Sequence, residues 1–115
     1  MSASIGAEHS GVAEGVAEIR VVLPVPLRAL SGAGSELRLT VAAPPSVHSV
    51  VDAIEAIYPM LRGTIRDRGT RQRRAFVRFY ACSRDWSHHD MGEALPEPVR
   101  AGREPLLIVG AMAGG

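Results

Sequence analysis

The sequence predicts a single α+β domain in which a mixed sheet of four to five strands carries one main helix packed on one face. Its length of 115 residues and its 46% hydrophobic content suit one modest core. Residues 46–61 show helical periodicity, whereas several short runs before and after them have the β-branched or alternating composition of strands. The helix is therefore expected to cover a sheet built from both halves of the chain.

The N-terminal segment, residues 1–18, is expected to be a flexible extension. It is rich in Gly, Ala, Ser and Glu, and it repeats the tetrapeptide Gly-Val-Ala-Glu at 11–14 and 15–18. Neither the helical period nor the strand period is sustained there. We therefore predict that order begins at Ile19 and that the domain spans residues 19–115.

Two strands are predicted at the start of the domain. Residues 19–23 form a short β-branched run that Pro24 closes, as expected for a largely buried strand. Residues 36–41 alternate strictly between apolar and polar side chains, which is typical of a strand with one exposed face. A turn carrying Gly32 and Gly34 separates the two runs, so we expect an antiparallel hairpin.

An amphipathic helix is predicted after the hairpin. Ser46 stands where an N-cap hydroxyl would accept hydrogen bonds from free backbone N–H groups, and Pro59 is expected to end or kink the helix. Each buried side chain on its apolar face contributes about 1.5–3 kcal/mol before entropy, so the helix needs a sheet to cover. The apolar face consists of Val47, Val50, Val51, Ile54, Ile57, Tyr58 and Leu61.

The second half of the chain is predicted to add two more strands. Residues 66–74 are polar throughout and indicate a loop, whereas residues 76–82 carry both phenylalanines and a tyrosine and indicate a strand. Residues 83–102 have mostly turn composition, with a short helical turn around 95–100. The continuous apolar run at 106–109 then predicts the last strand.

The first and last strands are predicted to be central neighbours in the sheet. Neither has the clean alternation of a half-exposed strand, so both faces of each are expected to be largely enclosed. A hairpin, a covering helix and a returning strand would then make a right-handed crossover. This order of elements is that of a β-grasp, or ubiquitin-like, architecture.

Composition excludes several functions. A formal net charge of +1 argues against a dedicated nucleic-acid or membrane-surface binder. No apolar stretch approaches the ~20 residues that a membrane span needs, so a cytoplasmic location is expected. All thirteen basic side chains are arginine, which rules out lysine-dependent phosphate-binding loops and Schiff bases. Cys82, His88 and His89 lack zinc-ligand spacing, so neither a bound metal nor a bound cofactor is predicted.

The C-terminal residues from about 110 onward, Gly-Ala-Met-Ala-Gly-Gly, are expected to form an extended tail that leaves the middle of the sheet. Six residues reach roughly 20 Å when extended. Gly114 and Gly115 carry no Cβ and can pass through a channel too narrow for side chains. The Gly115 carboxylate would be ionised at neutral pH and is a poor electrophile, so another agent must activate it.

These features together resemble the MoaD/ThiS family of ubiquitin-like sulfur carrier proteins. The matching pieces are the helix face ending in Tyr58-Pro59, the strand at 76–80 and the C-terminal run 109–115 with its final Gly-Gly. Two positions depart from the family pattern, since many relatives have proline at Gly110 or Ala111, and Cys82 stands where asparagine is often found.

The resemblance implies that an adenylating enzyme uses ATP to activate the Gly115 carboxylate. Sulfide or a persulfide would then displace AMP and leave a C-terminal thiocarboxylate. The chain would be a carrier and substrate rather than an enzyme. A sulfur-accepting synthase would receive the sulfur for molybdopterin, thiamin, cysteine or a related metabolite.

Three groups of residues are candidates for docking these partners. Phe76, Phe79 and Leu106 would form an exposed apolar patch, with core packing as the alternative for each. The arginines within residues 66–74 would either be solvated or dock an acidic partner surface. The arginines named for this role are Arg71, Arg73 and Arg74, and the tail residues that would accompany Gly114 into a partner are Ala111, Met112 and Ala113.

Two further functions stay open. In the first, the chain is a protein modifier whose activated Gly115 forms an isopeptide bond with a lysine of another protein. The chain has no lysine of its own, so conjugate chains could not grow on its side chains. In the second, the chain is a noncatalytic β-grasp interaction subunit in which the Gly-Gly sequence is incidental.

Overall fold

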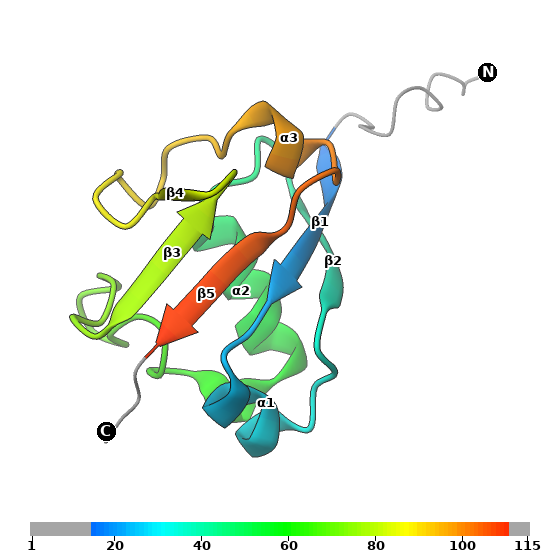
Figure 1. The fold of residues 1–115 in the computed structure, drawn as a ribbon. Coiled ribbons are helices and arrows are strands. Elements are labelled where there is room, and N and C mark those ends of the chain that lie inside the picture. The colour runs from blue at the N-terminus through cyan, green and yellow to red at the C-terminus, as the bar shows by residue number, and fades with distance from the viewer. Residues whose placement is uncertain (1–14, 111–115) are drawn as a thin grey trace.

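Five strands form one mixed sheet in the order β2-β1-β5-β3-β4 (Figure 1). The computed structural model describes residues 15–110. Strand β1 pairs in parallel with β5, and every other neighbouring pair is antiparallel. In chain order the elements are β1 (Val16–Val22), α1 (Val25–Ser31), β2 (Leu37–Ala42), α2 (Val47–Ile57), the 3₁₀ helix η2 (Pro59–Leu61), β3 (Val77–Ala81), β4 (Arg84–Asp85), α3 (Glu97–Arg100) and β5 (Leu106–Gly110).

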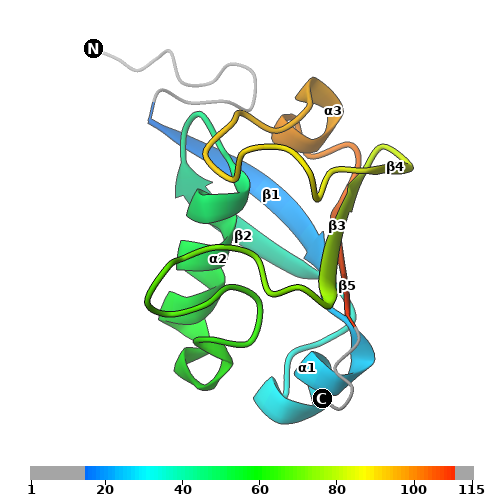
Figure 2. The same cartoon turned by 90° about the vertical axis from the view of Figure 1, so that its left-hand side faces the viewer.

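The predicted β-grasp architecture is confirmed. The first and last strands are adjacent in the middle of the sheet, with Val21 opposite Leu106 and Val22 opposite Leu107. Helix α2 packs on one face of the sheet, as Figure 2 shows from the side. The expectation that both faces of β1 and β5 are largely enclosed is wrong. Each strand buries only the face toward α2, because no element of residues 15–110 covers the outer face, and Val109 on that face is 47% exposed.

The predicted hairpin is also present, since β1 and β2 are antiparallel over six residue pairs. Strand β1 begins at Val16, earlier than the predicted start of order at Ile19. Strand β1 starts before Ile19 because Ala17 is buried on the face of the sheet that α2 covers and pairs with Val41 of β2. The rest of the predicted extension, residues 1–14, lies outside the described residues.

Helix α1 replaces the simple turn that the sequence predicted between the first two strands. Pro26 stands in the first turn, where its missing N–H costs nothing. Gly32 closes the helix in the left-handed conformation, with φ 77°, and donates its N–H to the Arg28 carbonyl. Leu27 anchors the helix to the core. Seven residues are too few to show clear periodicity, so only these end signals could have predicted the helix.

Helix α2 begins and ends as predicted. The Ser46 side chain accepts from the Ser49 N–H at 3.2 Å, and the Ser49 side chain accepts from the Ser46 N–H at 2.8 Å. The α-helix ends at Ile57, and Pro59 opens the 3₁₀ turn. The prediction that Ile57 belongs to the buried face is wrong, since this last residue of the α-helix is 56% exposed. None of the helices within residues 15–110 has the length and apolarity that a membrane crossing requires.

The β3–β4 hairpin was not predicted beyond its first strand. Cys82 and Ser83 form its turn with φ values of 54° and 65°. A two-residue turn with two positive φ angles usually carries Gly or Asn, so this pair gives no turn signal in the sequence. The short helical turn predicted around 95–100 is present as α3.

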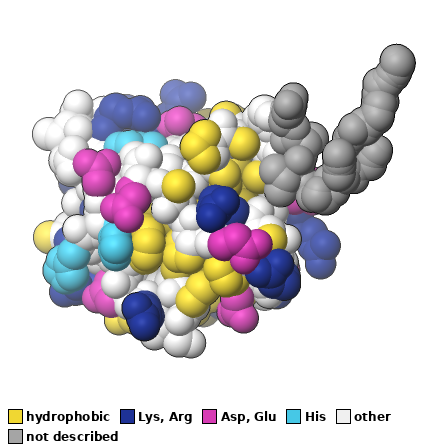
Figure 3. Space-filling view, turned by 90° about the horizontal axis from the view of Figure 1, so that it is seen from above, with side chains coloured by type: hydrophobic (Ala, Val, Ile, Leu, Met, Phe, Trp, Pro, Cys, Tyr) yellow, Lys and Arg dark blue, Asp and Glu magenta, His cyan; other side chains and the backbone are white. Residues whose placement is uncertain are grey.

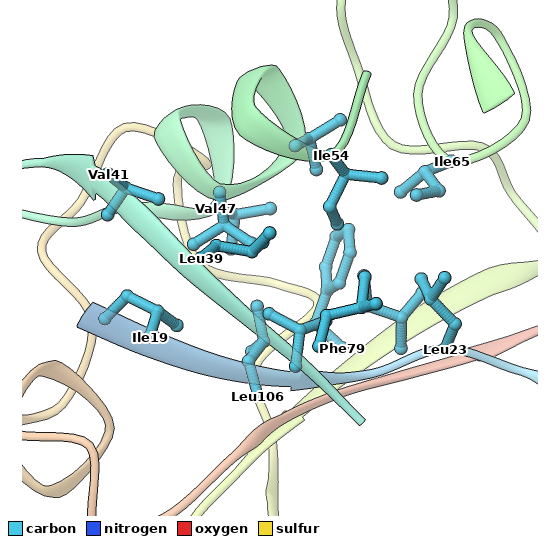
Figure 4. Packing of buried hydrophobic residues seen from close by; sticks show 14 of the residues in the cluster. Ile19, Leu23, Leu39, Val41, Val47, Ile54, Ile65, Phe79 and Leu106 are labelled. Carbon is cyan, nitrogen blue, oxygen red and sulfur yellow. The ribbon is translucent and has the colours of Figure 1, made fainter. Parts of the chain in front are cut away.

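Phe79 and Leu106 lie in the hydrophobic core, so their assignment to an exposed docking patch is wrong. Phe79 is 1% exposed and Leu106 is fully buried. Figure 4 shows both side chains between the sheet and α2, close to Leu39 and Ile54. The strand alternation explains this, because their side chains point to the same face of the sheet as the other buried residues of β3 and β5.

Replacing each phenylalanine by alanine should change the stability of the protein by different amounts. We expect Phe79→Ala to lower the free energy of unfolding by about 3–5 kcal/mol, because it leaves a cavity beneath α2. Phe76→Ala, at a side chain that is 46% exposed, should lower it by less than about 1 kcal/mol. Urea unfolding of both variants measures the difference, and equal losses would contradict the core assignment.

Candidate functional site

The end of β5 is the point at which the chain leaves the sheet. Gly110 lies opposite Val77, the first residue of β3. A Cβ added to Gly110 would lie 3.6 Å from Val77 Cγ2 and 4.0 Å from Pro24 Cγ. The chain therefore leaves between the start of β3 and the junction of β1 with α1. The predicted tail residues Ala111, Met112, Ala113, Gly114 and Gly115 lie outside the described residues.

Three exposed apolar side chains border this exit, and we call them the exit patch: Val25, Phe76 and Val109. Pro24, Val77 and Gly110 meet at the exit. In the sequence, Val25 follows Pro24, Phe76 precedes Val77 and Val109 precedes Gly110. Phe76 is exposed, as the docking role assigned to it requires. Exposed apolar groups gathered in one place are typical of an interaction site.

The outer face of the sheet beside the exit patch is mostly polar. Arg78 lies opposite Val109 and pairs with Asp85 at 3.2 Å. Farther along, the Arg20 Nη1 donates to the carbonyls of Gly102 and Arg103, at 3.4 and 2.9 Å. The exit patch is therefore an apolar area bordered by polar and charged groups, which is the usual make-up of a protein–protein interface.

The arginine-rich loop after α2 is tied to the helix rather than simply solvated. Arg66 is only 3% exposed, and its Nη2 contacts the carboxylates of Asp52 and Glu55. Its Nη1 lies 3.0 Å from His48 Nδ1 and 3.4 Å from the His48 carbonyl. His48, Asp52 and Glu55 fall at positions i, i+4 and i+7, so one face of α2 holds the guanidinium.

Sequence pattern alone does not predict this Arg66 network, because residues 66–74 are polar throughout and indicate only a loop. A signal was available, because His48, Asp52 and Glu55 form a stripe of hydrogen-bond acceptors on the polar face of α2. An arginine fork is the natural partner for two carboxylates. The sequence does not indicate which arginine of the loop contacts these acceptors.

The three arginines predicted to dock a partner have different roles. Arg73 donates from Nη1 to the carbonyls of Val77 and Arg74, at 2.8 and 3.2 Å. Arg74 donates from Nε to the Gly63 carbonyl at 2.8 Å. Both side chains are half-buried and hold the loop's own backbone, so they are not simply available to a partner. Arg71 is exposed and pairs with Asp52 at 3.2 Å.

The Arg66 network shifts the pKa values of two of its members. Burial raises the pKa of the Asp52 carboxyl, but hydrogen bonds from Arg66 and Arg71 outweigh it and hold the pKa below its ordinary value of 3.8. Burial lowers the pKa of His48 below 6.5, and the charges of Arg66 and Arg71 lower it further, against smaller effects of Asp52 and Asp90. Arg66 can only donate, so His48 Nδ1 accepts and the ring is neutral.

The end of the molecule that carries the two adjacent histidines has no patch of a single charge. Figure 3 shows basic, acidic and histidine side chains interspersed there with apolar ones. His89 stacks on Trp86, with ring centroids 3.5 Å apart, and its Nδ1 lies 3.2 Å from Glu93. Among residues 15–110, no three His, Cys, Asp or Glu side chains gather in a way that could hold a metal ion. Cys82 packs against the core.

Three solved structures share this fold. The small archaeal modifier protein 1 (SAMP1) of Methanosarcina acetivorans matches 87% of this chain and 98% of its own, with TM-score 0.65 and 22% identity. SAMP1 of Haloferax volcanii matches 85% of this chain and 99% of its own, with TM-score 0.65 and 17% identity. The Haloferax volcanii HVO 2177 protein matches 97% of this chain and 100% of its own, with TM-score 0.67 and 21% identity.

At these identities the likeness establishes a shared β-grasp fold. The sequence matches no protein-family model, and it matches no curated protein.

The His48–Arg66 contact predicts a pH dependence of stability. Because folding lowers the pKa of His48, the unfolded chain binds a proton at higher pH than the folded one. The contribution of neutral His48 is therefore complete above about pH 7 and is lost as the pH falls through 6.5 toward the folded-state pKa. The contribution of Asp52 is lost only at lower pH, below its ordinary pKa of 3.8.

We expect His48→Gln to flatten the fall in unfolding free energy between about pH 7 and about pH 5, since Gln keeps an acceptor for Arg66 but does not titrate. The matched control is His88→Gln, which changes an exposed histidine outside this network and should keep the wild-type slope. Urea unfolding across the pH range measures both. A wild-type slope in His48→Gln would contradict the assignment.

Proposed function

We propose that this chain is a sulfur carrier of the MoaD/ThiS type, whose Gly115 carboxylate is converted into a thiocarboxylate that donates sulfur in a biosynthetic pathway such as that of molybdopterin, thiamin or cysteine. The observation that carries the proposal is the position of β5. This last strand lies in the centre of a β-grasp sheet and ends at an exposed apolar exit. The sequence Ala-Met-Ala-Gly-Gly follows directly from that exit.

The proposed chemistry has two steps, and both are catalysed by a partner. A carboxylate oxygen of Gly115 attacks the α-phosphorus of ATP, and pyrophosphate leaves, which gives an acyl adenylate. Sulfide then attacks the acyl carbon, and AMP leaves with the C–O bond electrons, so that a thiocarboxylate remains. In this account the chain binds no cofactor, since ATP belongs to the adenylating enzyme. The chain is the substrate and the carrier.

The tail residues supply access to the partner's active site. Gly114 and Gly115 add no side-chain width, so their backbone can enter a narrow channel. The three residues before them, Ala111, Met112 and Ala113, are unbranched at Cβ or have only a methyl group there, so they add little width near the backbone. We assign them contacts along the channel wall, which hold Gly115 at the reacting centre.

The exit patch is proposed as the docking surface for both partners. The adenylating enzyme and the sulfur-accepting synthase act on the same carboxylate, so each must hold the domain where the tail begins. Phe76 and Val109 provide apolar area there, and a buried aromatic anchor is typical of the residues that dominate binding energy. The two partners would therefore compete for one surface, and sulfur transfer would require release from the first.

A protein modifier is the second candidate. It is favoured by the name small archaeal modifier protein, which two of the structures with the same fold carry. Both functions need the same acyl adenylate, and they differ in the nucleophile that follows. Attack by a lysine amine of another protein would give an isopeptide, and higher-mass conjugates of the chain in cell extracts would then distinguish the modifier from the carrier.

Adenylation itself can be measured by ATP–pyrophosphate exchange. With a cognate adenylating enzyme, the chain ending at Gly115 should support exchange, because acyl-adenylate formation is reversible. In the chain that lacks Gly115 the terminal carboxylate lies one residue, about 3.3–3.6 Å, short of the reacting position. The exchange rate of this chain should therefore be at least about tenfold lower. Equal exchange with both chains would favour the interaction-subunit alternative, in which the Gly-Gly sequence is incidental.

Two valine variants test the docking role of the exit patch. Val109 and Val16 are 47% and 42% exposed and lie toward opposite ends of the sheet. We expect Val109→Ser to raise the KM for the adenylating enzyme about tenfold, because an apolar contact is lost at the interface. Val16→Ser is the matched control and should change it by less than about twofold. Equal effects of the two substitutions would rule out a dominant role for the patch.

A further inference from the structure

A hollow of about 440 Å³ lies between α2 and the loop that follows it. Its lining is almost entirely charged and includes Asp52, Asp67 and four arginines. It is formed by residues 52–71 and does not include the exit patch. The lining arginines are Arg62, Arg66, Arg68 and Arg71.

The carboxylates of the hollow already have partners. Asp52 accepts from both Arg66 and Arg71, and Glu55 accepts from Arg66. Asp67 accepts the backbone N–H groups of Gly69 and Thr70, each at 2.8 Å. These hydrogen bonds fix the loop and hold the pKa of the Asp67 carboxyl below its ordinary value. The acidic side chains of the hollow are therefore already hydrogen-bonded to other groups of the protein.

Two arginines of the lining have no carboxylate partner among residues 15–110. The carboxylates of Asp52, Glu55 and Asp67 are matched by Arg66, Arg71 and Arg74, the last with its Nη1 3.7 Å from Asp67. The guanidinium groups of Arg62 and Arg68 make no hydrogen bond or ion pair with any group in residues 15–110, and both residues are exposed. The rim of the hollow thus presents two guanidinium groups with free donors.

A glycine allows two arginines to converge at this rim. Gly63 has φ 82°, and a Cβ placed on it would lie 3.6 Å from Arg68 Nε and 3.8 Å from Arg74 Nη2. Both cationic side chains therefore approach the same point above the Gly63 backbone. Arg74 is paired with Asp67, so of these two arginines it is Arg68 that lacks a carboxylate partner among residues 15–110.

We infer that this hollow binds an acidic segment of a partner protein, with carboxylate side chains seated on Arg62 and Arg68. An arginine fork matches a carboxylate in two parallel hydrogen bonds, which favours this chemistry. A nucleic acid fits less well, because no aromatic side chain lines the hollow and the whole chain has a formal charge of only +1. This binding requires no reaction at Gly115, so it goes beyond the proposed carrier function.

The assignment changes which arginines dock. Arg73 and Arg74, predicted from the sequence, are engaged with backbone carbonyls, whereas Arg62 and Arg68 have free donors. Arg71 has one guanidinium nitrogen on Asp52 and lies at the edge of the hollow. The internal hydrogen bonds of the loop fix its backbone before a partner arrives, which lowers the entropic cost of binding.

The test is an NMR titration of the full chain with an octaglutamate peptide, with octaglutamine as the uncharged control peptide. Octaglutamate should shift the amide signals of residues 62–71 and bind more weakly as salt is raised. The Arg62→Gln/Arg68→Gln double variant should bind about tenfold more weakly. The matched control is Arg38→Gln/Arg84→Gln, which removes the same charge from exposed positions on β2 and β4 and should stay within about twofold of wild type.

Three results would overturn the inference. Equal weakening by the two double variants would mean that net charge alone attracts the peptide. Peptide shifts confined to other residues would place the binding elsewhere. Displacement of the peptide by inorganic phosphate at equal concentration would indicate a small-anion site rather than a site for an acidic segment. None of these results bears on ATP–pyrophosphate exchange, so the carrier function is tested separately.

Discussion

The parallel pairing of β1 with β5 is the constraint on which the rest of the structure depends. Parallel neighbours cannot be joined by a tight turn, so the chain between them must cross over the sheet. Here the crossover contains β2, α2 and β3, and it places α2 over one face. Because β5 is flanked by β1 and β3, its last residue emerges from the middle of the sheet between two other elements. The site at Gly110 is a consequence of this topology.

The Arg66 network stabilises the part of the crossover that has little apolar content. Residues 62–76 contribute few buried side chains, and the loop is held instead by hydrogen bonds to α2 and to its own backbone. A buried arginine with two carboxylates and a histidine fixes one geometry, since loss of both carboxylates would leave the Arg66 charge without compensation. The loop therefore presents its remaining arginines, and Phe76 after them, from a rigid base.

The sequence predicted the parts of the fold that depend on periodicity and on end signals. The strict alternation of residues 36–41, the helix face from Val47 to Ile54 and the N-cap at Ser46 are present as expected, whereas Ile57 is exposed. Strand alternation did not reveal which face α2 would cover, so Phe79 and Leu106 could be taken either as core or as docking residues. Helix α1 is too short to show clear periodicity, so its local signals are only Pro26 and Gly32 at its ends. In the Arg66 network, local pattern shows the acceptors on α2 but not which distant arginine contacts them.

The central claim is that the chain carries sulfur on Gly115, and intact-mass measurement tests it most directly. The full chain and a chain lacking Gly115 are each incubated with ATP, sulfide and several adenylating enzymes, each of which is shown to be active on its own carrier. The account predicts a mass gain equal to the difference between one sulfur and one oxygen atom, in the full chain alone. An unchanged mass with every active enzyme would contradict it.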